Sequence, residues 1–259
     1  MSSWTGAAEA YRRSFGTLCA GPVDRMLADL PEGRHLDVGC GPGVLARRAV
    51  DRGRAVVAVD SDPGMVALSS TAVPGRTVRA ELPALPFGDG VFDAVTANFV
   101  VNHVGDPRAT VRELARVLGP GGSVALTVWP AGPTAWARLV ATAFTAAGVD
   151  PPVGRPLPSD LDFDRSVVGL SSLVTDAGLA VSAATQLGWD WEVDPDDLWA
   201  GVTGGVATAG RAYRSHPRSV RLRIDDAFRS AARAATHDGL LRLPSVAAYV
   251  VAGRGARSS

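Results

Sequence analysis

The hydrophobic pattern of residues 34–129 alternates between two periods. A continuous apolar run, which is typical of a strand buried on both faces of a sheet, occupies residues 55–59, and residues 35–38 and 123–129 are also predicted as strands. The stretches 44–52 and 107–118 place their apolar residues three and four positions apart, as amphipathic helices do. Strands that alternate with helices predict an α/β fold with a doubly wound, mostly parallel sheet.

A glycine-rich turn joins the first predicted strand to the first predicted helix. Its glycines can adopt positive φ angles and admit a ligand closer than any Cβ would allow. The helix that begins at Val44 offers unpaired backbone N–H groups to an anion. The turn is either a plain connection or a small-molecule site, and the candidate residues of that site are Asp37, Gly39, Cys40, Gly41 and Gly43.

Two cofactors commonly bind such turns, and the residues favour one of them. A dinucleotide fingerprint requires a third glycine or alanine where this chain has Val44. The carboxylate of Asp37 would also repel a pyrophosphate. S-adenosylmethionine carries no phosphate; its ammonium suits an acid, and its carboxylate suits the N–H groups of the turn and helix. The sequence therefore favours S-adenosylmethionine.

The end of the second predicted strand adds another acid and a helix start. Asp60 stands where an acid accepts hydrogen bonds from ribose hydroxyls, and Ser61 follows it in the loop. Asp62 is predicted to cap a helix whose first residue is Pro63. Met65, in the first turn of that helix, either lies against an adenine ring or fills the core.

Several segments occur in the order and spacing found in class I S-adenosylmethionine-dependent methyltransferases. The chain resembles the ubiquinone/menaquinone-biosynthesis-type branch, which modifies small molecules. The resemblance implies a Rossmann-like fold with seven strands. It also implies transfer of a methyl group to a quinone-like, aromatic or secondary-metabolite acceptor, with S-adenosylhomocysteine as product. The segments that carry it lie in about the first half of the chain, at 36–43, 57–65, 81–87, 92–104 and 114–127.

The resemblance also implies roles for residues after the third and fourth strands. Glu81, usually Asp in the family, accepts the adenine amino group, and the backbone N–H of Leu82 donates to the adenine ring. Asn98 and Phe99 contact the cofactor at the tip of the fourth strand. His103 is either a general base, since the reference pKa of a histidine lies near neutral, or a structural brace before the helix that starts at residue 107.

The regions outside these motifs are expected to cover the core. Residues 1–30 form an N-terminal helical cover, in which Tyr11 and Phe15 share one helix face. Tyr11 is expected over the cofactor, with an aromatic face towards the sulfonium, and Phe15 in the core. The methyltransferase core is expected at 31–191 and 244–252, with a disordered tail at 253–259.

A helical lid is expected at 192–243, inserted between strand six at 180–191 and strand seven at 245–252. This stretch is too long for a structureless loop, and it shows helical character at 195–202 and 218–235. The later half of the chain also carries tryptophans that suit either packing of the lid or an apolar acceptor pocket. They are Trp129, Trp136, Trp189, Trp191 and Trp199.

The charge composition argues against a nucleic acid as the methyl acceptor. The 259 residues carry 26 basic and 26 acidic side chains, so no net charge attracts a nucleic acid. All basic residues are arginines, which suggests a bacterial gene of high GC content.

Neither a metal site nor a targeting segment is predicted. Cys19, Cys40 and the four histidines lack metal-ligand spacing, so no metal is expected. Charges are scattered through the first thirty residues, so we expect a cytoplasmic protein without a signal peptide or membrane span. The sequence leaves the oligomeric state open.

Two alternatives remain. A non-catalytic, regulatory protein that binds S-adenosylmethionine would carry the same cofactor motifs. An NAD(P)-dependent oxidoreductase could share the layered fold, although Val44 and Asp37 disfavour it.

Overall fold

The computed structural model describes residues 6–154 and 156–255, and the chain divides into two compact units. The helical unit consists of Met1–Leu18, Gly132–Arg155 and Gly188–Ser245. The sheet unit consists of Cys19–Ala131, Pro156–Leu187 and Val246–Ser259.

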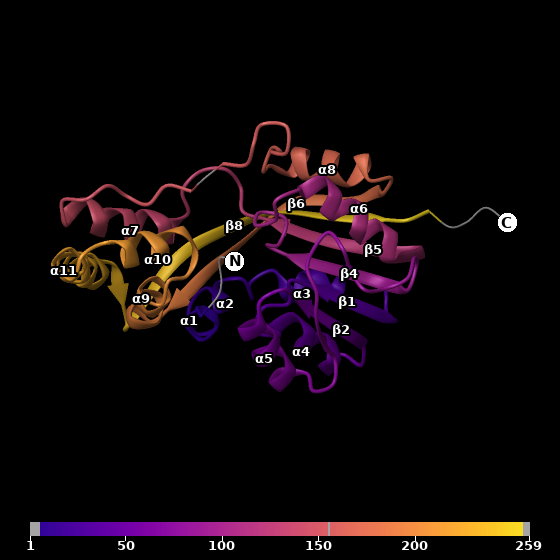
Figure 1. The fold of residues 1–259 in the computed structure, drawn as a ribbon, viewed down its shortest axis with the longest axis horizontal. Helices are drawn as coiled ribbons and strands as arrows, with labels where there is room; N and C mark the ends of the chain where they lie inside the picture. Colours follow the sequence, from indigo (N-terminus) through magenta and orange to yellow (C-terminus); the bar gives the residue numbers. More distant parts are fainter. Residues whose placement is uncertain (1–5, 155, 256–259) are drawn as a thin grey trace. The chain divides into compact units, whose positions relative to one another are not determined.

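A single sheet has the strand order β3-β2-β1-β4-β5-β8-β6 (Figure 1). Strands β1 to β5 pair in parallel, and β8 runs antiparallel to β5. The two-residue β7 pairs with β8 alone. The predicted doubly wound, mostly parallel sheet is confirmed. Its strands are β1 (Arg34–Val38), β2 (Ala55–Asp60), β3 (Thr77–Arg79), β4 (Phe92–Asn98), β5 (Leu118–Val128), β6 (Ala180–Val193), β7 (Thr236–His237) and β8 (Leu240–Gly253).

The helices of the sheet unit start where the sequence places capping residues. The side chains of Asp62, Asp106 and Ser166 each accept backbone N–H bonds at a helix start, as N-caps do. Pro63 and Pro107 occupy the first helical positions, as predicted. These helices are α3 (Val23–Ala28), α4 (Val44–Asp51), α5 (Pro63–Ala72), α6 (Pro107–Val117) and α8 (Val167–Asp176).

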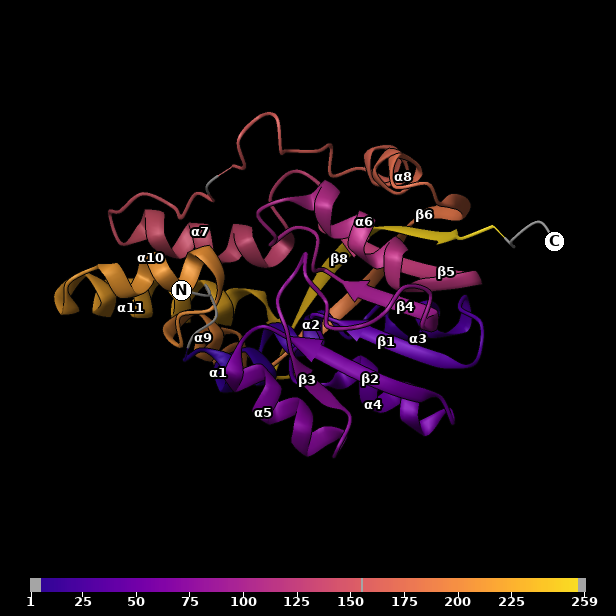
Figure 2. The ribbon, with the colours of Figure 1, turned by 45° about the vertical axis from the view of Figure 1, so that its right-hand side comes forward.

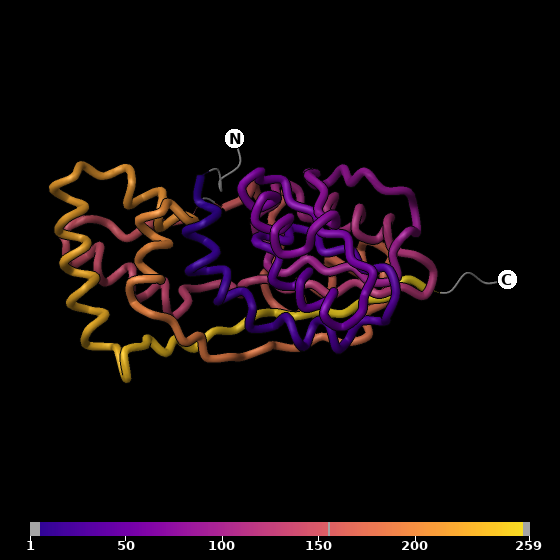
Figure 3. Tube along the Cα trace, turned by 90° about the horizontal axis from the view of Figure 1, so that it is seen from below, coloured from indigo at the N-terminus to yellow at the C-terminus, as the bar shows by residue number. Residues whose placement is uncertain are grey.

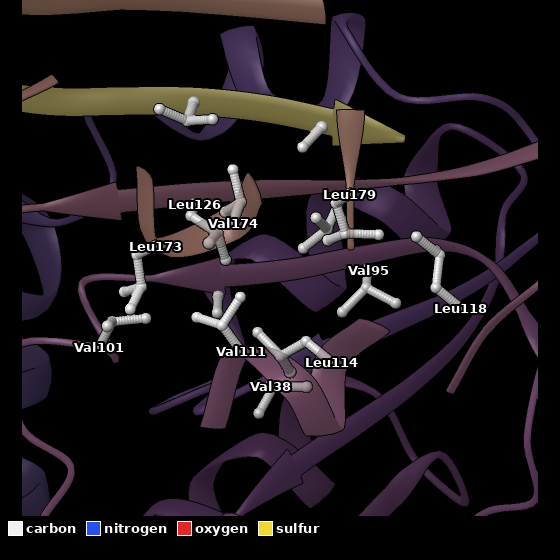
Figure 4. Packing of buried hydrophobic residues seen from close by; sticks show 14 of the residues in the cluster. Val38, Val95, Val101, Val111, Leu114, Leu118, Leu126, Leu173, Val174 and Leu179 are labelled. Carbon is white, nitrogen blue, oxygen red and sulfur yellow. The ribbon is translucent and has the colours of Figure 1, made fainter. Parts of the chain in front are cut away.

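Alternate residues of the strands enter two cores, one on each face of the sheet. On one face, α6 and α8 pack over β1, β4 and β5, with Val111 and Leu114 of α6 fully buried (Figure 4). On the other face, α3 and α4 pack over β2, β5 and β8. A parallel sheet buried on both faces explains why its strands read as continuous apolar runs.

The structure starts β5 five residues earlier than the sequence predicts. The Gly-Pro-Gly-Gly segment at 119–122, which follows the predicted helix at 107–118, lies in an irregular strand start, where the pairing with β4 passes from Leu118 directly to Ser123. A Cβ on Gly122 would come within 2.9 Å of the Asp93 carbonyl oxygen. The bulge therefore requires glycine at this close approach of two backbones.

In the helical unit, α11 packs against α7 (Figure 2), and α9 packs against both α10 and the N-terminal α1 (Figure 3). The predicted helices at 195–202 and 218–235 are present, whereas α10 was not anticipated. The helices are α1 (Ala8–Arg13), α2 (Phe15–Leu18), α7 (Ala135–Ala146), α9 (Pro195–Thr203), α10 (Ala207–Ser215) and α11 (Arg218–Ala235).

The N-terminal segment breaks at Ser14, so the expectation that Tyr11 and Phe15 share one helix face is wrong. Ser14 is non-helical at the end of α1, and its hydroxyl donates to the Ala10 carbonyl at 2.6 Å. Phe15 begins α2 and is buried between Trp136, at 4.7 Å between ring centroids, and Trp191, at 5.9 Å. The predicted core position of Phe15 is confirmed.

The two units divide the chain differently from the expected segments. Residues 19–30, expected in the N-terminal cover, belong to the sheet unit. Residues 132–155, expected in the core, belong to the helical unit, where α7 packs on α11. The expected tail at 253–259 begins with Gly253, still in β8, and residues 256–259 lie outside the described part.

Within the described residues, no helix has both the length and the apolar character needed to cross a bilayer. The same residues contain no group of three or more His, Cys, Asp or Glu side chains arranged to hold a metal ion.

Candidate cofactor site

The predicted cofactor residues of the first, second and fourth strands lie at one edge of the sheet unit. β1 pairs in parallel with β2 on one side and with β4 on the other. The carboxyl ends of the three strands, which carry Asp37, Asp60 and Asn98, therefore meet at the same edge. Ligands of doubly wound sheets bind beyond this edge, next to the strand where the order reverses.

The glycine turn has the backbone conformation that the sequence predicts. Gly39, Gly41 and Gly43 have φ angles of 64°, 54° and 88°. A Cβ on Gly39 would lie 2.4 Å from Cγ2 of Val100, so a side chain there would displace the loop after β4. Gly43 stands at the N-cap of α4 without a side-chain cap, which leaves backbone N–H groups of the helix start for another acceptor.

Asp60 joins the glycine turn to the loop after β2. Its carboxylate accepts hydrogen bonds from the backbone N–H groups of Gly41 and Asp62, each at 2.9 Å. Burial raises the pKa of the Asp60 carboxyl, and these two N–H groups oppose the rise. A carboxylate has about four acceptor positions, so Asp60 can still accept ribose hydroxyls. Ser61 follows in the same loop, and its carbonyl accepts from Arg79 Nε at 3.1 Å.

Asp37 is a buried carboxyl with one oxygen left open. Its side chain is 1% exposed, and Oδ1 accepts a hydrogen bond from the Thr96 hydroxyl at 3.0 Å. Oδ2 is also buried but accepts no hydrogen bond of normal geometry from the described residues. Burial raises the pKa of Asp37 to about 7, although Thr96 and the backbone N–H of Ala46 lower it. A buried acid with an open acceptor beneath a glycine turn fits the ammonium of S-adenosylmethionine.

The structure gives Asn98 and Phe99 a bracing role that sequence reasoning missed. The Asn98 amide donates to the Cys19 carbonyl at 2.8 Å and accepts from the Thr127 hydroxyl at 2.7 Å. Phe99 has a φ of 56°, and its backbone N–H donates to Thr127 Oγ1 at 2.9 Å. The Phe99 ring stacks on Trp129 at 3.8 Å. The cofactor contacts of Asn98 and Phe99 stay predictions.

The predicted adenine residues lie in the loop after β3 and in α5. Glu81 is exposed, with a backbone bridge to Ala84, and Leu82 is half-buried. Met65 is 4% exposed in the first turn of α5. None of these positions conflicts with an adenine ligand, whose contacts stay a prediction.

Cys40, in the middle of the turn, has a buried thiol within 3.5 Å of the Ser69 hydroxyl. Burial raises the pKa of this thiol, which keeps it protonated and unreactive at neutral pH.

His103 and Tyr11 are the two remaining candidates. His103 is exposed, in the loop before α6, where its backbone N–H donates to the Val100 carbonyl at 2.8 Å. Asp106 caps α6 by accepting from the Ala109 N–H at 2.8 Å. Tyr11 is half-buried on α1 of the helical unit. The proposed contact of Tyr11 with the cofactor therefore stays a prediction.

The strand order, the glycine turn after β1 and the acid at the end of β2 are those of a Rossmann-like fold. Residues 36–126 match the methyltransferase domain family.

Named relatives and solved structures agree with this fold. An uncharacterized methyltransferase of Mycobacterium sp. (strain KMS) is 42% identical over 129 residues, which are 45% of this chain and 51% of that protein. The chain thus spans about half the length of the first curated relatives it matches. The demethylmenaquinone methyltransferase of Mycobacterium bovis (strain BCG / Pasteur 1173P2) is 29% identical over 186 residues, covering 71% of this chain and 76% of that one. The crystal structure of a putative methyltransferase from Bacillus halodurans C-125 shares the fold, with a TM-score of 0.53 and 17% identity over 90% of this chain and 98% of that chain.

Proposed function

We propose that this protein transfers a methyl group from S-adenosylmethionine to a small-molecule acceptor. The observation that carries the proposal is the buried Asp37 carboxyl, with its open Oδ2, beneath a turn of three positive-φ glycines. Such an acid disfavours a pyrophosphate ligand and suits a cationic ammonium.

Each end of the cofactor has its own residues in this proposal. Asp37 and the N–H groups of the turn hold the amino-acid end, and Asp60 holds the ribose. Glu81 and Leu82 hold the adenine. The remaining sides of the cofactor are lined by Ser61, Met65, Asn98 and Phe99. Tyr11 covers the cofactor.

The bound cofactor supplies a methyl group that its sulfonium already activates for in-line displacement. The residues of the chain therefore need to align the acceptor, exclude water and remove a proton from an acceptor O–H, N–H or C–H. His103 is the candidate base for that proton, because it lies in the loop that follows the tip of β4.

The acceptor class rests on composition and on names of relatives. The net charge of zero gives no field for a nucleic acid. Of the two curated relatives described above, the one that spans more of this chain is named a demethylmenaquinone methyltransferase. We therefore propose an acceptor of the quinone-like, aromatic or secondary-metabolite type. We also propose a location in the cytoplasm.

Calorimetry with S-adenosylhomocysteine, S-adenosylmethionine and NADH tests the cofactor. We expect both sulfur ligands to bind and NADH not to bind; NADH binding alone would contradict the proposal. Transfer of a labelled methyl group into the small-molecule fraction of a bacterial extract tests catalysis, with the RNA fraction as control. Cofactor binding without transfer to any fraction would favour a regulatory protein.

A further inference from the structure

Three buried polar side chains on two neighbouring strands form a continuous chain of hydrogen bonds. His35 and Asp37 lie two residues apart on β1, so both side chains point to the same face of the sheet. Thr96 of β4 is the register partner of Asp37. The Thr96 hydroxyl lies 3.0 Å from His35 Nε2 and 3.0 Å from Asp37 Oδ1. His35 and Thr96 are 0% exposed.

The proton positions follow from what each group can donate. The Thr96 hydroxyl has a single proton, and an ionised carboxylate can only accept. Thr96 therefore donates to Asp37, and its oxygen accepts from the Nε2–H of a neutral His35. Burial, followed by the charge of Arg54, lowers the pKa of His35 to about 3, so the ring is neutral at physiological pH. The Leu36 carbonyl, at 3.5 Å, is a poorer acceptor for the Thr96 proton.

We propose that Thr96, aligned by His35, is a positioning residue that holds the Asp37 carboxylate ionised and oriented for the cofactor's ammonium group. This inference rests on the proposed function. Without the Thr96 donor, desolvation of Asp37 is opposed only by the Ala46 N–H. The other titratable groups that face this carboxyl are Asp60 from β2, which raises its pKa, and the protonated Cys40 thiol of the turn. Loss of the donor therefore favours the neutral acid, which attracts an ammonium less.

Two ligands separate binding of the ammonium group by Asp37 from binding of the adenine and ribose. S-adenosylhomocysteine contains the ammonium, whereas 5′-methylthioadenosine keeps the adenine and ribose but lacks the whole amino-acid end. In calorimetry at pH 7.5, Thr96→Val should weaken S-adenosylhomocysteine binding by about tenfold to a hundredfold, because a hydrogen bond to a charged group is lost. Binding of 5′-methylthioadenosine should change less than about twofold. The loss for Thr96→Val should shrink at pH 9, where the acid ionises again.

Matched variants control for folding. Thr96→Ser keeps the hydroxyl and should restore the affinity for S-adenosylhomocysteine. Thr110, on α6, is a buried threonine whose hydroxyl has no hydrogen-bond partner among the described residues. Thr110→Val should leave both affinities unchanged. His35→Leu removes the Nε2–H that donates to Thr96. It should weaken S-adenosylhomocysteine binding as Thr96→Val does, but by a smaller factor. This variant also tests the proposal if Thr96→Val does not fold.

A titration of the unliganded protein tests the inference without any cofactor. The carboxyl carbon resonance of Asp37, assigned by its loss in Asp37→Asn, should titrate at a higher pH in Thr96→Val than in the unsubstituted protein. An unchanged midpoint, or equal losses for both ligands, would overturn the role of Thr96. If the unsubstituted protein binds 5′-methylthioadenosine and S-adenosylhomocysteine equally well, the role is also wrong. If it binds neither, the proposed function itself fails.

Discussion

Asp60 holds the glycine turn of the neighbouring strand, because its Oδ2 accepts the Gly41 backbone N–H at 2.9 Å. Its Oδ1 accepts from the N–H of Asp62, the residue that caps α5. One carboxylate thus fixes both the turn after β1 and the loop after β2. An acid at this position shapes the site in addition to any contact with a ribose.

Asp60→Asn should therefore weaken both structure and binding. The amide offers one acceptor oxygen, so one of the two N–H groups loses its partner, at a cost of about 1–2 kcal/mol in unfolding free energy. We expect S-adenosylhomocysteine to bind about tenfold more weakly or worse. Urea denaturation and calorimetry measure the two effects. Asp51→Asn, at an exposed pair with Arg47, is the control and should change stability by less than about 0.5 kcal/mol.

The raised pKa of Asp37 predicts a stability that falls as pH rises. The unfolded carboxyl ionises near its ordinary value of 3.8, whereas the buried carboxyl keeps its proton until about pH 7. The native state therefore binds the extra proton between these values, and its stabilising contribution is lost as pH rises through 7. The loss amounts to at most about 4 kcal/mol. Denaturation at pH 5 and pH 8 should show this decline, and Asp37→Asn should reduce it, leaving the smaller decline due to Asp60, whose pKa is also raised by burial.

Arg116 on α6 is expected to hold the loop that follows the predicted adenine residues. Its guanidinium donates to the Phe87 and Leu85 carbonyls and pairs with Glu113 and Asp89. Arg116→Lys cannot reproduce this fork of donors and should cost about 1–2 kcal/mol, since the side chain is one-third exposed. Hydrogen exchange of residues 82–89 should accelerate. Arg229→Lys, in an exposed pair with Asp226, should leave both measurements unchanged.

Two adjacent acids of α11 provide a matched test in the helical unit. Asp225 Oδ1 accepts from Trp199 Nε1 at 2.9 Å and from the Tyr213 hydroxyl at 2.8 Å. Asp225→Ala leaves both donors unpaired and should cost about 2–3 kcal/mol. Asp226→Ala removes only a surface pair with Arg229 and should cost less than about 0.5 kcal/mol. Equal effects in thermal denaturation would contradict this difference.

His103→Ala separates the two roles of this histidine. If His103 is the base, His103→Ala should lower the turnover rate by at least about tenfold. Release of S-adenosylhomocysteine with an acceptor found in the extract screen measures turnover, and a melting curve measures stability. Normal turnover with lowered stability would assign the histidine a structural role in the loop before α6.

Local signals made much of the fold predictable. Asp62 and Asp106 cap helices through hydrogen bonds from backbone N–H groups two or three residues ahead. Their role can therefore be predicted from a short stretch of sequence. The positive φ angles of Gly39 and Gly43 follow similarly from a turn between a strand and a helix.

Relationships that depend on strand register were not predictable from such signals. Thr96 meets Asp37, and Thr127 meets Asn98, only because β1, β4 and β5 pair in a particular register. Likewise, α7 belongs to the helical unit because α11 packs against it. The two helices are far apart in the sequence, so no local signal predicts this contact. The contact of the Ser14 hydroxyl with Gly201 of α9 is likewise one between residues far apart in the sequence.

The buried Asp37 has a practical consequence for finding ligands. The acid that stabilises the empty protein at low pH is the same group that must be ionised to attract an ammonium. A thermal-shift screen in a mildly acidic buffer would therefore start from the most heat-resistant empty protein and report the smallest gain from a true ligand. Screening and crystal soaking belong at about pH 8 to 9, above the titration of this side chain.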